Sequence, residues 1–255
     1  MPETMRKETG MSSVEIETMR SVEDDLWWYQ ALRAHVAGTI QPPRPEFDLL
    51  DAGCGTGGML ARVRERFPQA VLTGLDFSER AIELTRLRET GATLFQGSVD
   101  ALPFADASFD VVLSLDVIIV GGVDEDRAIA EMHRVLRRGG TLILNLPAFD
   151  FLRGSHDVAV NIARRFDRSR LERLLARADF TVEHSTYWNM SLLPAVAAVR
   201  WLSRGRASQP QVSSDLKPMW PPLNAALAAL AKSELAISRS APLPFGTSLF
   251  AVARK

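Results

Sequence analysis

Residues 51–58 read Asp51-Ala52-Gly53-Cys54-Gly55-Thr56-Gly57-Gly58. This segment follows the short apolar run Phe47-Asp48-Leu49-Leu50, which is typical of a strand, and precedes residues 59–64, which are typical of the first turns of a helix. Because glycine has no Cβ, the backbone here can turn sharply and approach a ligand closely, with the helix N-terminus facing that ligand. The segment therefore predicts a strand, a glycine turn and a helix that together bind a nucleotide-like molecule.

The glycine turn is compatible with two kinds of nucleotide. Gly53, Gly55 and Gly58 satisfy the dinucleotide pattern G-x-G-x-x-G, and Asp76 follows at the spacing of an acid that binds a ribose. Asp51 favours a different ligand, because a carboxylate at the end of the strand attracts an ammonium group and repels a pyrophosphate. A nucleoside that carries a cationic amino acid fits better, and an NAD-dependent oxidoreductase remains an alternative.

Asp51 followed by Gly53, Gly55 and Gly57 resembles the first motif of the class I S-adenosylmethionine-dependent methyltransferases, in particular the small-molecule, type 11-like group. The resemblance extends over residues 47–147, where apolar runs and amphipathic segments alternate in the family's order. It implies an α/β, Rossmann-like fold with a seven-stranded, mostly parallel sheet, an antiparallel last strand and a helical cap. It also implies S-adenosylmethionine as cofactor, S-adenosylhomocysteine as its product, and transfer of a methyl group to oxygen, nitrogen or carbon.

The expected strands lie at 71–75, 93–96, 108–115 and 141–146, and the expected helices at 57–66 and about 125–137. Gly139-Gly140 is expected to cap the second of these helices. Asp76 can accept both ribose hydroxyls, since Ser78 is already placed to cap the next helix. The loop 97–104 resembles the family's adenine-binding loop, with Ser98 where relatives often have an acid. The expected cofactor residues are Asp51, Gly53, Cys54, Gly55, Gly57, Asp76, Phe77, Ser98, Val99, Asp100 and Leu115.

The segment after the fourth predicted strand departs from the family, which commonly has a glutamate-histidine pair here. This chain reads Asp116-Val117-Ile118-Ile119-Val120 instead. His156 beside Asp157 is the predicted catalytic base, because an imidazole near a carboxylate titrates close to neutral pH; the alternative is that His156 only braces its loop. A base is optional, since orientation can supply much of the rate. The departure leaves open a non-methylating cyclase-type enzyme or a non-catalytic protein on the same fold.

The chain divides into an α/β core at 46–188 and 246–255, an N-terminal arm and lid helix at 1–45, and a helical insertion at 189–245. Residues 1–20 are expected to form a mobile arm or a short helix, and residues 23–33 a helix that packs on the sheet or covers the ligand. The insertion, with helices at 190–202 and 223–237 and a polar linker at 203–222, is expected to cover the site or to form a homodimer interface. The predicted substrate residues are Trp27, Trp28, Tyr29, Asp116, His156 and Tyr187.

Composition narrows the function. A net charge of -1 over 255 residues disfavours a nucleic-acid partner, and aromatic residues in the cap favour a small hydrophobic acceptor such as a natural product of secondary metabolism. Cys54 is the only cysteine, so no disulfide framework and no metal site is expected. The polar N-terminus has no signal-peptide pattern, and no apolar segment reaches the roughly 20 residues that span a bilayer. These features indicate a cytoplasmic enzyme.

Overall fold

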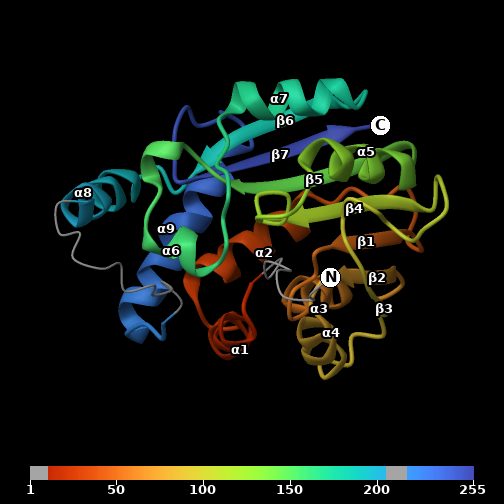
Figure 1. Ribbon diagram of the computed structural model, residues 1–255, viewed down its shortest axis with the longest axis horizontal. Coiled ribbons are helices and arrows are strands. Elements are labelled where there is room, and N and C mark those ends of the chain that lie inside the picture. The colour runs from red at the N-terminus through yellow and green to blue at the C-terminus, as the bar shows by residue number, and fades with distance from the viewer. Residues whose placement is uncertain (1–10, 205–216) are drawn as a thin grey trace, which may run out of the picture.

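The computed structural model describes residues 11–204 and 217–255. Its centre is a seven-stranded sheet with the strand order β3-β2-β1-β4-β5-β7-β6 (Figure 1). The strands are β1 (Asp48–Ala52), β2 (Val71–Asp76), β3 (Thr93–Gln96), β4 (Phe109–Leu115), β5 (Leu136–Pro147), β6 (Thr181–Trp188) and β7 (Ser248–Arg254).

Strand β1 lies at the point where the chain reverses direction across the sheet. It pairs in parallel with β2 on one side and β4 on the other, so that Asp51 stands opposite Gly74 and Leu113. Strand β7 runs antiparallel to both β5 and β6, with Phe250 opposite Asn145 and Thr186. The expected mostly parallel sheet with an antiparallel last strand is confirmed. Ligands of such sheets bind beyond the carboxyl ends of the strands at the reversal point, which here is the end of β1 and β4.

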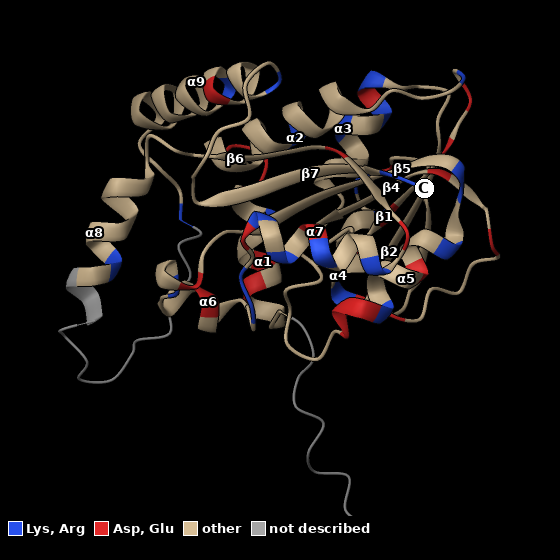
Figure 2. Cartoon of the chain, turned by 90° about the horizontal axis from the view of Figure 1, so that it is seen from above, with Lys and Arg blue, Asp and Glu red and all other residues tan. Residues whose placement is uncertain are grey.

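Helices cover both faces of this sheet (Figure 2). Helices α2 (Trp27–Thr39), α3 (Gly58–Arg66) and α9 (Pro221–Ser238) pack on one face, and α5 (Glu125–Val135) and α7 (Arg168–Arg177) pack on the other. Strand β4 contributes Val112 to one core and Val111 and Leu113 to the other. The almost continuous apolar sequence of β4 therefore reflects burial on both faces.

Helix α4 (Glu79–Arg86) packs with α2 and α3 through Ile82, and the other helices contribute less to the two large cores. Helix α1 (Ser13–Val22) is capped by Ser12, whose hydroxyl accepts from the Glu15 amide at 3.3 Å, and packs through Ile16 on α4. The insertion forms α8 (Leu193–Arg204) and α9, while η1 (Asp150–Leu152) and α6 (Ser155–Ala159) follow β5. Most of the predicted linker 203–222 and half of the predicted arm 1–20 lie outside the described residues.

Helix α2 begins at Trp27, four residues later than the expected start at residue 23. The preceding residue, Leu26, has an extended backbone with φ −67° and ψ 127°, so the helix cannot continue toward its N-terminus. Glu23 instead ends α1, where its amide donates to the Met19 carbonyl at 2.8 Å. The acidic residues thus lie in the connection between two helices and do not form the first turn of α2.

The predicted glycine cap of α5 is wrong. The helix ends at Val135, and Leu136 adopts extended geometry at the start of β5. The Lys255 ammonium group donates to the His133 carbonyl at 2.6 Å and the Leu136 carbonyl at 2.8 Å, so a distant lysine satisfies the helix end. Gly139, with φ +72°, donates its amide to the Lys255 carbonyl at 2.9 Å within the strand region. A tertiary contact therefore replaces the local cap.

Candidate active site

The glycine turn between β1 and α3 is held against the end of β2. The amides of Gly53 and Cys54 both donate to the Leu75 carbonyl, at 2.7 Å and 2.9 Å. Gly53 has φ +96°, and a Cβ at this position would lie 2.2 Å from Cγ2 of Val117. Both the backbone conformation and the close approach of the β4 end therefore require glycine here.

Asp51 ends β1 beneath this turn. Its side chain is buried, and within the described residues its Oδ2 atom has no hydrogen-bond partner. Burial is the main cause that raises the pKa of Asp51 to about 7, with the negative charges of Asp76 and Glu23 adding to it. An unpaired buried carboxylate costs free energy, and a cation beside it removes that cost. The position is therefore suited to an ammonium group.

Asp76 ends β2 and faces the same space. Its Oδ2 accepts from the Gly55 amide and its Oδ1 from the Ser78 amide, both at 2.9 Å, which fixes the carboxylate relative to the glycine turn. Each carboxylate oxygen can accept a further hydrogen bond. Ser78 caps α4 through the Ala81 amide at 3.3 Å, as predicted, so Asp76 is not needed for that purpose. Burial raises the pKa of Asp76.

The loop after β3 brings Ser98 and Val99 to the cavity wall. The Ser98 hydroxyl donates to Asp100 Oδ1 at 2.6 Å, and Asp100 Oδ2 accepts from the Asp124 amide at 3.2 Å. Asp100 therefore orients Ser98 from behind the wall.

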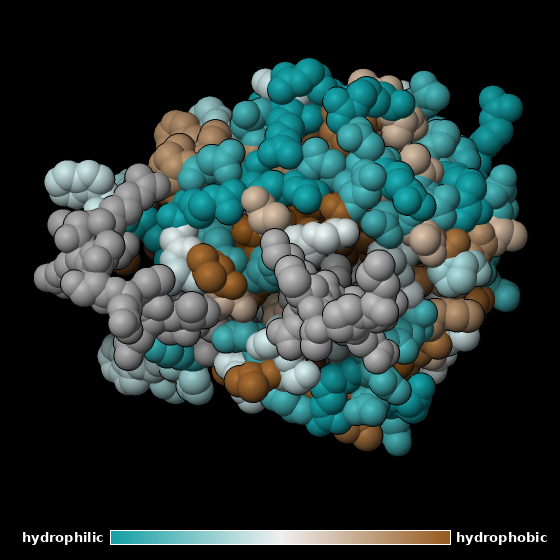
Figure 3. Space-filling view, in the orientation of Figure 1, coloured by the Kyte–Doolittle hydropathy of each residue, from teal (hydrophilic) through white to brown (hydrophobic). Residues whose placement is uncertain are grey.

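A single cavity of about 590 Å³ connects these residues with the inner sides of α1, α2, α6 and α8. In the space-filling view, hydrophobic atoms lie deep in the middle of the face toward the viewer, among hydrophilic residues (Figure 3). The predicted site residues that line the cavity are Trp27, Trp28, Tyr29, Asp51, Gly53, Cys54, Gly55, Asp76, Phe77, Ser98, Val99, Leu115, Asp116 and His156. The predicted residues Gly57, Asp100, Asp157 and Tyr187 are not part of its lining.

The predicted His156–Asp157 pair is divided between the cavity and the protein interior. His156 lines the cavity, whereas Asp157 is buried and accepts from Arg165 Nε at 2.7 Å and from the Gly154 amide at 2.8 Å. The Arg165 guanidinium lowers the pKa of Asp157 although burial opposes it, so this carboxylate stays ionised. Asp157 fixes the start of α6 and is directed away from the cavity.

Tyr187 supports the wall from outside. Its hydroxyl oxygen accepts from the Arg168 amide at 2.9 Å, and its ring stacks on Phe149 with centroids 4.9 Å apart. Two other aromatic residues of the predicted cap also lie away from the ligand space: Trp188 is fully buried and Trp201 is largely exposed. Trp188 stacks on Trp28 with centroids 5.7 Å apart, and in this way it supports a residue that does line the cavity.

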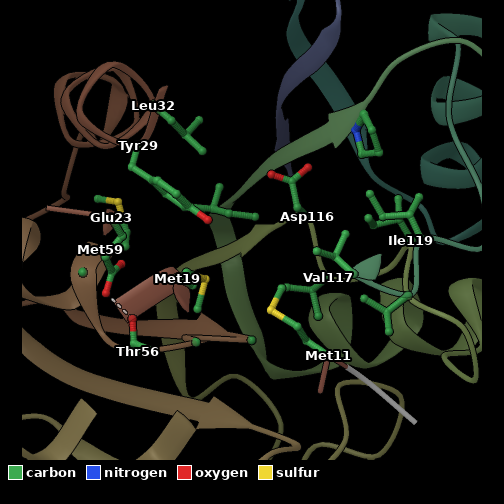
Figure 4. Close-up of a pocket in the computed structure, with 18 of the residues that line it drawn as sticks. Met11, Met19, Glu23, Tyr29, Leu32, Thr56, Met59, Asp116, Val117 and Ile119 are labelled. Carbon is green, nitrogen blue, oxygen red and sulfur yellow. Dashed lines mark hydrogen bonds between the residues drawn. The ribbon is translucent and has the colours of Figure 1, made fainter. Parts of the chain in front are cut away.

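An ion cluster that no sequence pattern predicted joins α1 to the glycine turn. We call it the Glu23 cluster. Its acids are Glu23 and Asp24, from the connection between α1 and α2. The Thr56 hydroxyl donates to the buried Glu23 carboxylate, which also accepts from Arg88 Nη2 at 2.5 Å, and the Arg33 guanidinium donates to Asp24 at 3.2 Å (Figure 4 shows the Thr56–Glu23 bond). Its members are Glu23, Asp24, Arg33, Thr56 and Arg88.

Asp116 directly follows β4 and lines the cavity, and its carboxylate points into the space among the lining side chains (Figure 4). Its backbone has φ +59°, its amide donates to the Asn145 carbonyl at 2.8 Å, and its Oδ2 accepts from Asn145 Nδ2 at 2.9 Å. Burial raises the pKa of Asp116 to about 7, although Asn145 and Arg165 both act to lower it. A carboxyl group that titrates near neutrality therefore faces the space beyond the glycine turn.

The region from the glycine turn to strand β5 matches a known protein family. A family described as a methyltransferase domain matches residues 50–144, the range that contains the glycine turn, Asp76 and Asp116. Residues 50–144 are a class I methyltransferase domain. S-adenosylmethionine is the cofactor of this family. The unpaired Asp51 oxygen in the methyltransferase domain fits the ammonium group of that cofactor, and the oriented Asp76 carboxylate fits its ribose.

Curated relatives match this chain over part of their length. A probable S-adenosylmethionine-dependent methyltransferase of Mycolicibacterium smegmatis is 31% identical over 172 residues, which are 63% of this chain and 62% of the relative. The chain spans 35% to 62% of the length of the curated relatives that it matches.

Two solved structures show the same fold over most of the chain. The putative methyltransferase in a complex with the Haloferax volcanii Trm112 activator has a TM-score of 0.62 at 17% identity, and the match covers 94% of this chain and 97% of the other. The [4+2]-cyclase SpnF has a TM-score of 0.58 at 20% identity, and the match covers 89% and 80%. Within residues 11–204 and 217–255, no helix is both long enough and apolar enough to cross a bilayer.

Proposed function

We propose that this chain transfers a methyl group from S-adenosylmethionine to a small, mostly hydrophobic acceptor. The observation that carries this proposal is the continuity of the cavity, which extends from Asp51 and Asp76 at the glycine turn to apolar side chains beyond Asp116. A cofactor at the turn and an acceptor beyond it would lie in one enclosed space. The apolar residues at the acceptor end are Ile119, Val120, Leu152, Val160 and Ile162.

The side chains at the glycine turn have distinct proposed roles. Asp51 receives the ammonium group, Asp76 accepts from the ribose hydroxyls, and the loop with Ser98 and Val99 contacts the adenine. When bound, the cofactor supplies an electrophilic methyl group. The protein orients the acceptor toward this group and excludes water, which can account for much of the rate of such a transfer.

The proposed cofactor site is tested by calorimetric titration of the protein with S-adenosylhomocysteine. We expect a dissociation constant in the micromolar range and a loss of about 1 to 3 kcal/mol in binding free energy for Asp76→Ala, because hydrogen bonds to a charged group are lost. Asp106→Ala is the matched control, since Asp106 is exposed and pairs with Arg134 away from the cavity. Absence of binding to the parent protein would refute the proposed function.

A cyclase-type enzyme that keeps the cofactor site without methyl transfer is a second candidate. It is favoured by the apolar segment Val117–Val120, which replaces the glutamate-histidine pair common in the family. Incubation with S-adenosylmethionine labelled in its methyl group, against a panel of hydrophobic hydroxyl and amine compounds, separates the two candidates. Tight binding of S-adenosylhomocysteine without transfer of label to any compound would favour the cyclase.

A further inference from the structure

We propose that Asp116 is the general base of this reaction and that the acceptor carries an acidic hydroxyl group, a phenol or an enol, on an apolar body. This inference rests on the proposed methyltransferase function and adds the substrate class and the residue that takes the proton. It replaces the predicted base His156 by a carboxylate that the sequence analysis had assigned only to substrate binding.

The position of Asp116 is the first support. The end of β4 lies next to the end of β1, so Asp116 stands at the boundary between the glycine turn and the apolar end of the cavity. In Figure 4 its carboxylate projects into the space between Tyr29 and Ile119, and the Tyr29 ring extends from α2 toward the same space. An acceptor hydroxyl beside Asp116 would therefore be next to the cofactor.

The orientation of the carboxylate is the second support. The indole of Trp188 can only donate, and its Nε1 atom lies 2.9 Å from Asn145 Oδ1. This contact fixes the Asn145 amide so that its Nδ2 group must face Asp116 Oδ2. One carboxylate oxygen is thus held by the buried Trp188–Asn145 pair, and within residues 11–204 and 217–255 the other, Oδ1, receives no hydrogen bond. Preorganisation of this kind is expected of a catalytic group.

The charges around Asp116 are the third support. Arg165 faces it from the segment after α6 and acts to lower its pKa, while Glu23, Tyr29, Asp51, Asp76, His156 and Arg200 line other parts of the same cavity. Burial raises the pKa of Asp116 more than Asn145 and Arg165 lower it, and brings it to about 7. A base with a pKa near the working pH is most effective, and it is suited to a phenol-like acid with a pKa of about 10.

The same carboxylate discriminates among acceptors. A carboxylic acid would enter already ionised, would need no base and would be repelled by Asp116. An unactivated aliphatic alcohol is too weak an acid for a carboxylate to deprotonate effectively. In the proposed step the acceptor O–H bond breaks and its proton moves to Asp116. The acceptor oxygen forms a bond to the methyl carbon, and the C–S bond breaks with its electron pair remaining on sulfur.

The test is a pH titration of protein labelled with ¹³C at the aspartate carboxyl carbons, followed by nuclear magnetic resonance. We expect two carboxyl groups with midpoints near pH 7, one absent in Asp116→Asn and the other absent in Asp51→Asn. Asparagine tolerates the left-handed backbone at position 116 and keeps an oxygen for Asn145 to donate to, so this variant is expected to fold. In His156→Gln both titrations are expected to remain.

Phenol, whose pKa of about 10 keeps it neutral at pH 7, then serves as a probe of the acceptor site. At saturating concentration it is expected to shift the Asp116 resonance and its midpoint and to leave Asp51 unchanged, and Asp116→Asn is expected to weaken its binding at least threefold. A normal Asp116 midpoint near pH 4, or a probe that does not bind or leaves Asp116 unmoved, overturns the inference. S-adenosylhomocysteine is titrated into the same samples. If it binds while Asp116 fails to respond to the probe, the inference fails alone; if it does not bind, the proposed function fails as well.

Discussion

Asp51 lies in an environment that disfavours its ionised carboxylate when no ligand is bound. Asp51 is buried with one oxygen unpaired, and its pKa lies near 7 in the folded protein against 3.8 ordinarily. The folded state therefore binds more protons than the unfolded state between these values, and stability falls as pH rises from about 4 to about 7. A positively charged group on the ligand would stabilise the ionised Asp51 carboxylate and so offset this loss of stability.

The pH dependence of cofactor binding follows from Asp51. An ammonium group favours its ionised form, so binding below pH 7 releases a proton and weakens by up to about tenfold per pH unit as pH falls. Calorimetry with S-adenosylhomocysteine at pH 6 and pH 8, in two buffers of different ionisation enthalpy, measures that proton. Asp51→Asn should bind weakly without proton release, yet be more stable than the parent at pH 8 in the absence of ligand. Proton release that persists in Asp51→Asn but is lost in Asp116→Asn would contradict this assignment.

The sequence placed residues at the glycine-turn end of the cavity better than residues near its apolar end. Asp51 and Asp76 directly end predicted strands, so strand periodicity alone places them at one edge of the sheet. Asp157 differs, because its partner Arg165 is eight residues away and no pattern shows that both side chains are buried. The Glu23 cluster could not be predicted either, because its members are distant in sequence: Thr56 and Arg88 lie 33 and 65 residues from Glu23.

Helix α1 is attached to the site through α4 and through the Glu23 cluster. It packs on α4 through Ile16, and the Glu23 cluster joins its C-terminal end to the glycine turn. Its residues Met11, Ile16, Met19 and Glu23 lie at the cavity wall. Residues of α1 therefore line the cavity beside Trp27, Trp28 and Tyr29 of α2, the helix for which a lid over the ligand was one expectation.

Replacement of Glu23 tests whether this cluster holds α1 in place. In Glu23→Gln, Arg33 and Arg88 lose their buried counter-charge, and we expect local opening of α1 to become easier by about 1 to 3 kcal/mol. Faster amide hydrogen exchange over residues 13–22 and weaker S-adenosylhomocysteine binding would be observed. The control is Glu17→Gln in the same helix, whose partner Arg80 is at an exposed position. Equal exchange in both variants would count against the cluster.

The sequence predicted which helices and strands form better than it predicted the residues at which they begin and end. Strands are short apolar runs between turns, and their positions agree with the sequence pattern within a few residues. The start of α2 was misplaced because Leu26 is extended and Asp24 pairs with Arg33 in the connection before it, and the end of α5 because Lys255 donates to its last carbonyls. Both contacts join residues that local periodicity cannot relate.

The described residues form two large hydrophobic cores that share one sheet, besides a small cluster around Ile16. Ile143 and Leu144 are neighbours in β5 but point to opposite faces, one core containing the α2, α3 and α9 contacts and the other those of α5 and α7. Because every central strand contributes to both cores, neither core can unfold while the sheet remains intact.

Substitution in either core should therefore affect one common transition. Ile143→Ala and Leu144→Ala are each expected to lower the free energy of unfolding by about 2 to 5 kcal/mol, since both side chains are fully buried. Urea unfolding followed by circular dichroism and by tryptophan fluorescence would show one midpoint that both variants shift. Separate midpoints for the two probes would indicate that the faces unfold independently.

The cavity wall combines residues inside the range that the methyltransferase family matches with residues outside it. Its cofactor end comes from the contiguous residues 51–99, inside the range that the methyltransferase family shares, whereas α8 and Met219, which lie at its wall, belong to the later insertion 189–245. Mutations in the insertion can therefore alter which acceptor is accommodated while the residues proposed to hold the methyl donor are inherited unchanged. In evolutionary terms, new acceptors can be recruited without the ancestral cofactor site being rebuilt.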